Sequence, residues 1–272
     1  MTNRGPTSET DSGDAPRCAS GKLRLYIEES LPKERLTTGA SLTLGKDRSL
    51  HLVSALGMAE GARVFLFNGR DGEWAARISV AHKTNCVLEL VEQTRPHEPL
   101  ADIWLLFAPV TRVPPTAIIR KATEMGAAVI QPVFTARSVV TRLEEGGLRA
   151  SAIEAAEQCG LLAVPDVRGA ARLSVLLENW TEGAPGRRIL FCDETEAPGT
   201  TRAVLDRLAD EGGRTAPFAV LIGPEGGFSP AERELLRKRT DTVAISLGPR
   251  VMRADTAATA ALALVGLMLG DW

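Results

Sequence analysis

The sequence predicts an α/β protein in two parts, a small β-rich module followed by a larger domain built on a parallel sheet. Short runs rich in Val, Ile, Leu and aromatic residues crowd the chain before residue 92. A polar stretch with two prolines, EQTRPHEP at residues 92–99, then interrupts the pattern. After it, apolar strands alternate with helix-length segments, which is typical of a parallel sheet covered on both faces.

The N-terminal part begins with residues 1–20, which are polar and small and predict a disordered tail without the apolar run of a signal peptide. A barrel or sandwich module follows, with strands expected at residues 23–27, 62–68, 73–80 and 86–91. Gly69 and Gly72 lie in the segment NGRDG, whose residues tolerate positive φ, so a hairpin is expected there. A short helix is expected over residues 49–58.

The second part carries the alternating pattern to the end of the chain. Strands are expected at residues 103–108, 128–134, 188–193, 218–223 and 243–247. Helices are expected at residues 115–125, 148–159, 200–210, 230–239 and 256–269. The last helix is alanine-rich and too short to cross a bilayer, so a buried helix is the better interpretation.

Composition narrows the function classes. The formal net charge of −2 gives no overall nucleic-acid signature, so any RNA binding must come from a local basic surface. Four cysteines form no C-x-x-C pair, which argues against a zinc site and fits a reduced, cytoplasmic compartment. All three histidines precede Leu100, which excludes a histidine-based catalytic triad from the second part alone.

The segment LIGPEGGFSPAE, residues 221–232, is the first motif with chemical content. A buried strand runs into Gly223, Gly226 and Gly227, and a helix follows with Ser229 as its N-cap and Glu232 completing a capping box. Such a loop lets a ligand approach the backbone at the carboxyl end of a strand. The alternative is a tight turn before a capped helix. A phosphate-binding loop fits poorly, because the G-x-x-x-x-G-K pattern is absent.

The second motif with chemical content is the segment ISLGPRVMRADTA, residues 245–257. A strand meets Gly-Pro, and an irregular segment leads to a helix whose expected N-cap is Asp255 or Thr256. Arg250 and Arg253 stand just before that helix, where its dipole disfavours cations. Either an anionic ligand faces them or they are two solvated loop arginines.

Taken together, the two motifs closely resemble those of the SPOUT methyltransferases and, within them, the ribosomal RNA small subunit methyltransferase E family. That family methylates N3 of a uridine in small-subunit rRNA. The resemblance extends to residues 24–27, the Gly69–Gly72 hairpin, and residues 119–126, 136–139 and 154–160. It therefore covers nearly the whole chain after the tail.

The resemblance implies a PUA-like β-barrel for RNA over residues 21–94 and a SPOUT domain with a trefoil knot over residues 98–272, although knots are otherwise nearly absent from proteins. It also implies S-adenosyl-L-methionine as cofactor, 16S rRNA in the small ribosomal subunit as partner, and a cytoplasmic homodimer without a metal or a membrane span. Two alternatives stay open. One is a SPOUT enzyme acting on tRNA or 23S rRNA, and the other is a non-catalytic RNA-binding ribosome-assembly factor.

Carried over by motif, the cofactor contacts are Leu221, Ile222, Gly223, Gly226, Ser246, Leu247, Gly248, Met252 and Arg253. Arg253 is the candidate to stabilise the uracil anion, and Glu225 the candidate acceptor for the N3 proton or the cofactor amine. The expected RNA contacts are Arg24, Lys121, Arg137, Gln158 and Arg250. The chain departs from the family pattern at Ala254, Asp255 and Leu161. Leu161 stands where the family carries a basic residue, so one phosphate contact is expected to be weaker.

Overall fold

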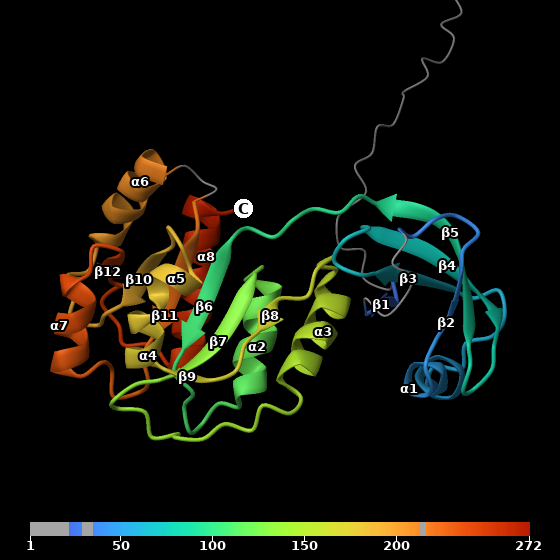
Figure 1. The fold of residues 1–272 in the computed structure, drawn as a ribbon, viewed down its shortest axis with the longest axis horizontal. Coiled ribbons are helices and arrows are strands. Elements are labelled where there is room, and N and C mark those ends of the chain that lie inside the picture. The colour runs from blue at the N-terminus through green and yellow to red at the C-terminus, as the bar shows by residue number, and fades with distance from the viewer. Residues whose placement is uncertain (1–21, 29–34, 213–215) are drawn as a thin grey trace, which may run out of the picture.

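The computed structural model describes residues 22–28, 35–212 and 216–272, and these residues form two sheets side by side along the long axis of the molecule (Figure 1). The predicted tail, residues 1–20, lies outside the described residues. Residues 24–95 supply the first sheet and residues 103–245 the second.

The N-terminal sheet is a curled five-stranded sheet in the order β1-β3-β4-β5-β2 (Figure 1). Its strands are β1 Arg24–Tyr26, β2 Ser41–Thr43, β3 Arg63–Phe67, β4 Glu73–Val80 and β5 Val87–Arg95. All pairs are antiparallel except β1 with β3. The predicted helix is present as α1 Lys46–Leu50 and a π-helical turn, His51–Ala55. Strand β2 was not predicted, because only one of its three side chains, Leu42, is buried.

The second sheet is parallel throughout, as predicted, in the order β12-β10-β11-β6-β7-β8, with β9 also pairing with β7. Its strands are β6 Ile103–Phe107, β7 Val129–Phe134, β8 Asp166–Val167, β9 Ala171–Arg172, β10 Arg188–Cys192, β11 Phe218–Ile222 and β12 Thr242–Ile245. Strand β11 is buried along its whole length, which explains its continuous apolar run. The trefoil knot stays a prediction from the resemblance.

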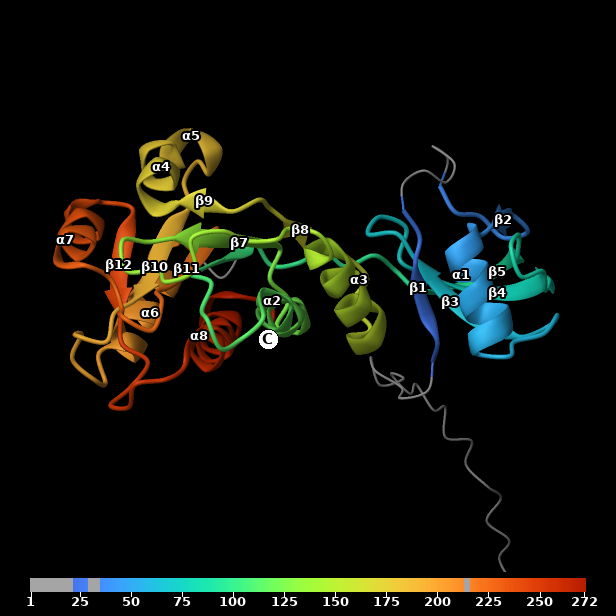
Figure 2. The same ribbon diagram turned by 90° about the horizontal axis from the view of Figure 1, so that it is seen from below.

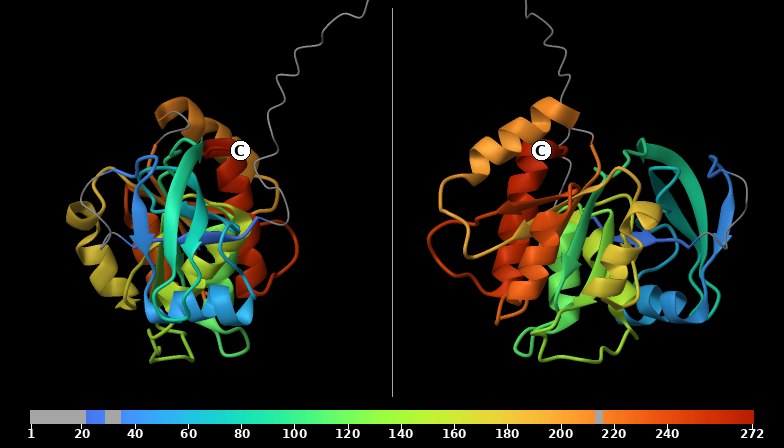
Figure 3. Two further views of the ribbon diagram at one scale, coloured as in Figure 1. Left: turned by 90° about the vertical axis from the view of Figure 1, so that its right-hand side faces the viewer. Right: turned by 60° about the vertical axis from the view of Figure 1, so that its left-hand side comes forward.

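Helices cover both faces of this sheet (Figure 2). They are α2 Pro115–Glu124, α3 Leu148–Cys159, α4 Leu173–Glu178, α5 Trp180–Gly183, α6 Thr201–Gly212, α7 Pro230–Lys238 and α8 Ala254–Leu269. One apolar core joins the sheet to α2, α3, α6 and α8, and another joins its opposite face to α4, α5 and α7. Helices α6 and α8 lie side by side (Figure 3, right). Helices α4 and α5 are too short to show a helical period, so the sequence did not reveal them.

Helix α3 joins the two parts. The Arg95 guanidinium donates to the carbonyl of Gly160 at the C-terminus of α3, at 2.9 Å. The Tyr26 amide donates to Glu157 Oε1 at 2.8 Å, and burial raises the pKa of the Glu157 carboxyl. Leu161 packs half-buried against the apolar cluster at this junction. The apolar residue at position 161 therefore has a packing role where the family pattern has a basic one.

A buried carboxylate fixes the β3–β4 hairpin and gives the first testable prediction. Asp71 accepts hydrogen bonds from Arg70, from Asn68 Nδ2 at 2.9 Å and from the Leu36 amide at 3.2 Å. The Arg70 hydrogen bond is the largest contribution, and together these contacts lower the pKa of Asp71 to about 2 against the opposing effect of burial. Because the folded-state pKa is depressed, the resulting stability is present above the ordinary value of 3.8 and is lost as pH falls through about 2.

We therefore expect Asp71→Asn to lower the free energy of unfolding by about 2 kcal/mol at pH 7, with the difference shrinking between pH 4 and pH 2. Urea unfolding of both proteins across that range measures it. Asp210→Asn is the matched control, since Asp210 is exposed on α6 and has no ion pair among the described residues. A difference that stays constant down to pH 2 would contradict the role given to the Asp71 charge.

Candidate active site at the carboxyl edge of the parallel sheet

Five loops leave the parallel sheet at the same edge, because parallel strands all end there. They follow β6, β7, β10, β11 and β12 and span residues 108–114, 135–147, 193–200, 223–229 and 246–253. The two predicted motif loops are among them. Strand β10 pairs with both β11 and β12, so its own loop starts between the two motif loops. The sequence prediction gave no role to that third loop.

The three glycines of the first motif loop differ in what surrounds them. A Cβ on Gly223 would lie 3.2 Å from the Phe228 ring, and a Cβ on Gly227 would collide with the Glu194 carboxylate. A Cβ on Gly226 would meet only Arg137, at an ordinary 3.6 Å. Gly223 is therefore closely packed against Phe228, and Gly227 has φ +62°, which favours glycine, whereas a Cβ at Gly226 would fit without a clash. Preceding them, Leu221 and Ile222 are buried, so their side chains pack in the sheet and only backbone reaches this edge.

The helix after this loop begins as predicted. Ser229 is the N-cap of α7, and its hydroxyl accepts from the Glu232 amide at 3.2 Å. In return the Ser229 amide donates to Glu232 Oε2 at 2.8 Å, which completes the capping box. The other oxygen of Glu232 accepts from the Ala136 amide at 2.7 Å. The capping box thus also ties the glycine loop to the loop after β7.

The second motif loop contains Ser246, which is buried, and then Leu247 and Gly248, which are half-buried. Gly248 has φ +105°, a backbone conformation that favours glycine, and a Cβ there would meet nothing within 4 Å. Met252 is half-buried against the core. Gly248 therefore leaves open space at this edge.

The expected N-cap of the last helix is wrong. Helix α8 begins at Ala254, and its N-cap is Arg253, which makes no side-chain cap. Asp255 lies inside the first turn, where its Oδ2 accepts from Lys121 Nζ at 2.8 Å. This hydrogen bond is the main cause that lowers the pKa of Asp255. The carboxylate is committed to α2, so it does not turn back to cap α8.

Two candidate side chains hold neighbouring loops together. Glu225 is exposed, and its Oε1 accepts from the Thr111 amide of the loop after β6, at 3.1 Å. Arg137, expected to contact RNA, donates through a guanidinium N–H to the Gly226 carbonyl at 2.8 Å. The first glycine loop is therefore hydrogen-bonded to the loop after β6 and to the loop after β7.

Asp193 is a buried carboxylate in the loop after β10. The sequence predicted it only as the last residue of a strand. Asp193 accepts from Arg233 Nε at 3.1 Å and from Arg237 at 3.0 Å, both on α7. Burial raises its pKa, but hydrogen bonds from Thr195 and Arg233 outweigh burial and keep the pKa low. An acidic residue directly after an apolar strand was the available signal, but its arginine partners lie about forty residues further along.

The expected RNA contacts fall into two groups. Arg24 is buried and its Nε donates to Glu73 at 2.8 Å, so its guanidinium is paired within the protein. Gln158 and Arg250 are exposed. Within the described ranges, four exposed arginines at the carboxyl edge have side chains with no hydrogen bond or ion pair: Arg112, Arg142, Arg250 and Arg253. Arg142 was missed, because nothing local distinguishes it from a solvated loop residue.

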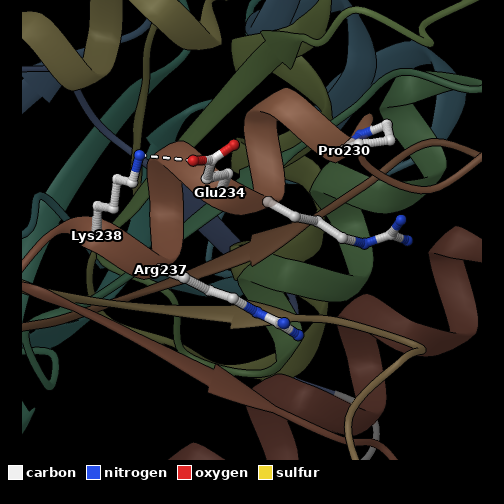
Figure 4. Close-up of a pocket in the computed structure, with 5 residues that line it drawn as sticks. Pro230, Glu234, Arg237 and Lys238 are labelled. Atoms are coloured by element: carbon white, nitrogen blue, oxygen red, sulfur yellow. Dashed lines mark hydrogen bonds and ion pairs between the residues drawn. The ribbon is translucent and has the colours of Figure 1, made fainter.

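Helix α7 carries a shallow surface pocket lined by Pro230, Arg233, Glu234, Arg237 and Lys238 (Figure 4). Lys238 Nζ donates to Glu234 at 2.6 Å within it. Since its lining comes from one helix and includes no residue of either glycine loop, it is not the predicted ligand site. In the described part of the chain, no three His, Cys, Asp or Glu residues are grouped to hold a metal ion, and no helix is long and apolar enough to cross a membrane.

Comparisons with known proteins agree with the motifs. Residues 96–266 match an RNA methyltransferase domain, and residues 44–91 match an RNA methyltransferase PUA domain. The ribosomal RNA small subunit methyltransferase E of Rickettsia conorii is 29% identical over 90% of this chain and 95% of its own length. The same-named protein of Bacillus subtilis is 25% identical over 91% of this chain and 99% of its own.

Two solved structures share the whole fold. A Legionella pneumophila protein in complex with the cofactor SAM is 25% identical, with a TM-score of 0.74 over 90% of this chain and 97% of that one. A ribosomal RNA small subunit methyltransferase E from Neisseria gonorrhoeae, bound to S-adenosyl methionine, is 24% identical, with a TM-score of 0.75 over 92% of this chain and 99% of that one. Both therefore support the arrangement of a PUA-like part and a parallel-sheet α/β part.

Proposed function

The chain belongs to the RNA methyltransferase family whose domain matches residues 96–266, and we propose that it transfers a methyl group from S-adenosyl-L-methionine to N3 of a uridine in 16S rRNA. The observation that carries the proposal is the pairing of the two glycine loops at one edge of the sheet. The relatives named ribosomal RNA small subunit methyltransferase E support the choice of RNA.

The residues present fit the cofactor. A Cβ at Gly248 would project into open space, and one at Gly226 would make only an ordinary contact with Arg137, so a larger side chain at either position would enter the backbone-lined cradle. We assign cofactor binding to the backbone of residues 221–226 and 246–248, together with Met252 and Arg253. The sulfonium group supplies a methyl group on a good leaving group, and the loops have to hold that methyl in line with the RNA nucleophile.

Arg253 and Glu225 are the groups we propose to act on the base. The Arg253 guanidinium is exposed and has no hydrogen bond or ion pair to the described residues, so it is available to the uracil oxygens as negative charge develops there. One oxygen of the Glu225 carboxylate accepts a hydrogen bond from the Thr111 amide, which orients the group. The other oxygen is then available to accept the N3 proton or a hydrogen bond from the cofactor amine. N3 lies on the Watson–Crick edge, so the uridine must be unpaired or flipped out.

We further propose that residues 21–94 dock RNA and residues 98–272 perform the chemistry, in a cytoplasmic homodimer. The four arginines with unpaired side chains, together with Lys121 and Arg137, form the RNA-facing surface at the carboxyl edge. Gln158 is a separate proposed RNA contact, at the end of α3 that meets the N-terminal part. Arg24 is left out because it is buried against Glu73. Binding of a polyanion through such a surface should weaken steeply as salt rises.

Calorimetry with S-adenosyl-L-methionine tests the proposed function directly, on the full chain. Saturable binding is expected with little dependence on salt, whereas binding of 16S rRNA should fall steeply with salt. A chain that binds rRNA but no cofactor would instead be an RNA-binding assembly factor. A methylated product at another base or ribose would point to a SPOUT enzyme with a tRNA or 23S rRNA target.

The double variant Arg112→Ala/Arg142→Ala tests the RNA-facing surface. Loss of two phosphate contacts should weaken rRNA binding and reduce the slope of log affinity against log salt by about 2, without changing cofactor affinity. Arg207→Ala is the control, because Arg207 is exposed on α6 and, among the residues that the structure describes, forms an ion pair with Glu211 alone. Equal rRNA affinity and equal slope in the double variant and the control would contradict this surface.

A further inference from the structure

The chain leaves the sheet at Ser246 with both backbone polar groups buried. The last bond of the β10–β12 ladder runs from the Asp193 amide to the Ile245 carbonyl, at 3.0 Å. Ser246 follows immediately and is only 6% exposed, yet β10 has already turned away into its loop. Buried backbone N–H and C=O groups without partners are destabilising, so both need a partner from elsewhere.

The hydroxyl of Thr201 supplies both partners. Its Oγ1 donates to the Ser246 carbonyl at 2.5 Å and accepts from the Ser246 amide at 3.0 Å. A hydroxyl can do this because it carries one donor and two acceptor lone pairs. Thr201 is the first residue of α6 and is itself buried, so packing fixes its position.

The link continues into the second glycine loop. The Ser246 hydroxyl accepts from the Gly248 amide at 3.3 Å, and Gly248 holds the loop's positive φ of +105°. A chain of three hydrogen bonds therefore runs from α6 through Ser246 to Gly248. These are backbone positions to which the proposed function assigns cofactor binding.

We propose that Thr201 is a positioning residue for the S-adenosyl-L-methionine site, acting through the backbone of Ser246. The inference rests on the proposed function, since it concerns the loop that is to bind the cofactor. The Thr201 side chain is buried and its hydroxyl is occupied on both sides, so it acts on the loop and not on the ligand. No neighbouring sequence feature marks this threonine, whose partner is forty-five residues away.

Thr201→Val keeps the shape of the side chain and removes the hydroxyl, whereas Thr201→Ser keeps the hydroxyl. On the full chain, calorimetry below the unfolding temperature should show the dissociation constant for S-adenosyl-L-methionine rising about tenfold or more in Thr201→Val. In Thr201→Ser the dissociation constant should stay within about twofold of that of the unmodified chain. Thr123→Val is the matched control, because it removes a buried threonine hydroxyl that bonds only within α2.

Amide hydrogen exchange without cofactor gives a second, activity-independent readout. The Ser246 and Gly248 amides should exchange faster in Thr201→Val and at the original rate in Thr201→Ser and Thr123→Val. Should Thr201→Val fail to fold, Ser246→Ala decides, since it removes only the bond to Gly248 and should still weaken cofactor binding.

The inference is overturned if Thr201→Val binds the cofactor with unchanged affinity. It is also overturned if Thr201→Val and Thr201→Ser lower the cofactor affinity equally. Unchanged affinity in Ser246→Ala overturns it as well when the valine variant does not fold. A different result would contradict the proposed function. If the unmodified chain binds no cofactor, that function is wrong, and the exchange rates still decide whether Thr201 holds the loop.

Discussion

Replacing Gly226 with valine is expected to weaken S-adenosyl-L-methionine binding by about a hundredfold or more while the protein stays folded. The structure makes this a selective change. Gly226 is not among the glycines with positive φ, and a Cβ there would meet only the aliphatic part of Arg137 at 3.6 Å. The new side chain would instead fill the cradle that the proposed function gives to the cofactor. Calorimetry on the folded variant measures the loss.

Gly45→Val is the control for the glycine loop. Gly45 has φ −64° and ψ 166°, which valine adopts readily, and a Cβ there would meet nothing within 4 Å. The cofactor affinity of Gly226→Ala should lie between those of Gly226→Val and Gly45→Val, since alanine adds only the Cβ. Gly248 is a poorer test, because its φ of +105° would strain any side chain whatever the ligand does. Unchanged affinity in Gly226→Val would show that this loop is a capped turn and not a ligand site.

Arg253→Ala should cut single-turnover methyl transfer by about 10²- to 10³-fold, the usual effect of removing one donor to a developing oxyanion. The melting temperature should move by no more than a few degrees, because the Arg253 side chain is exposed and makes no hydrogen bond or ion pair in the part of the chain that the structure describes. Cofactor affinity measured separately shows whether the loss lies in the chemical step.

Arg250→Ala distinguishes a transition-state role from RNA attraction. Arg250 is exposed in the same loop, and its loss should weaken rRNA binding and raise KM with little change in kcat. If Arg253→Ala behaves in the same way, Arg253 is an RNA contact. If Arg253→Ala lowers stability while the folded fraction keeps full activity, Arg253 is a structural residue of the α8 N-terminus.

The elements predicted best are those whose local sequence agrees with their environment. Strand β11 is buried along its whole length and reads as an uninterrupted apolar run, and the Ser229–Glu232 capping box was visible at its spacing of three. The carboxyl-edge position of both glycine loops followed from the parallel sheet alone. The chemistry assigned to those loops came from the resemblance of their motifs, not from periodicity.

What the sequence could not show depends on contacts between distant residues. Arg24 was expected on RNA but is buried against Glu73, forty-nine residues away. Asp255 was expected to cap α8 but is taken by Lys121, one hundred and thirty-four residues away. Each assignment was reasonable for an isolated segment and changed once packing supplied a partner of opposite charge. Asp193 and Thr201 were missed for the same reason, since their partners lie forty or more residues along the chain.

Methylation at N3 of a 16S rRNA uridine can be detected by a mass-spectrometric map of rRNA. Ribosomal RNA from a strain lacking this gene would be compared with RNA from the parent strain, nucleoside by nucleoside. One 3-methyluridine is expected to disappear from 16S rRNA and to return when the purified protein and S-adenosyl-L-methionine are added. Loss of a methyl group from another base or a ribose, or from tRNA or 23S rRNA, or no loss at all, would contradict this expectation.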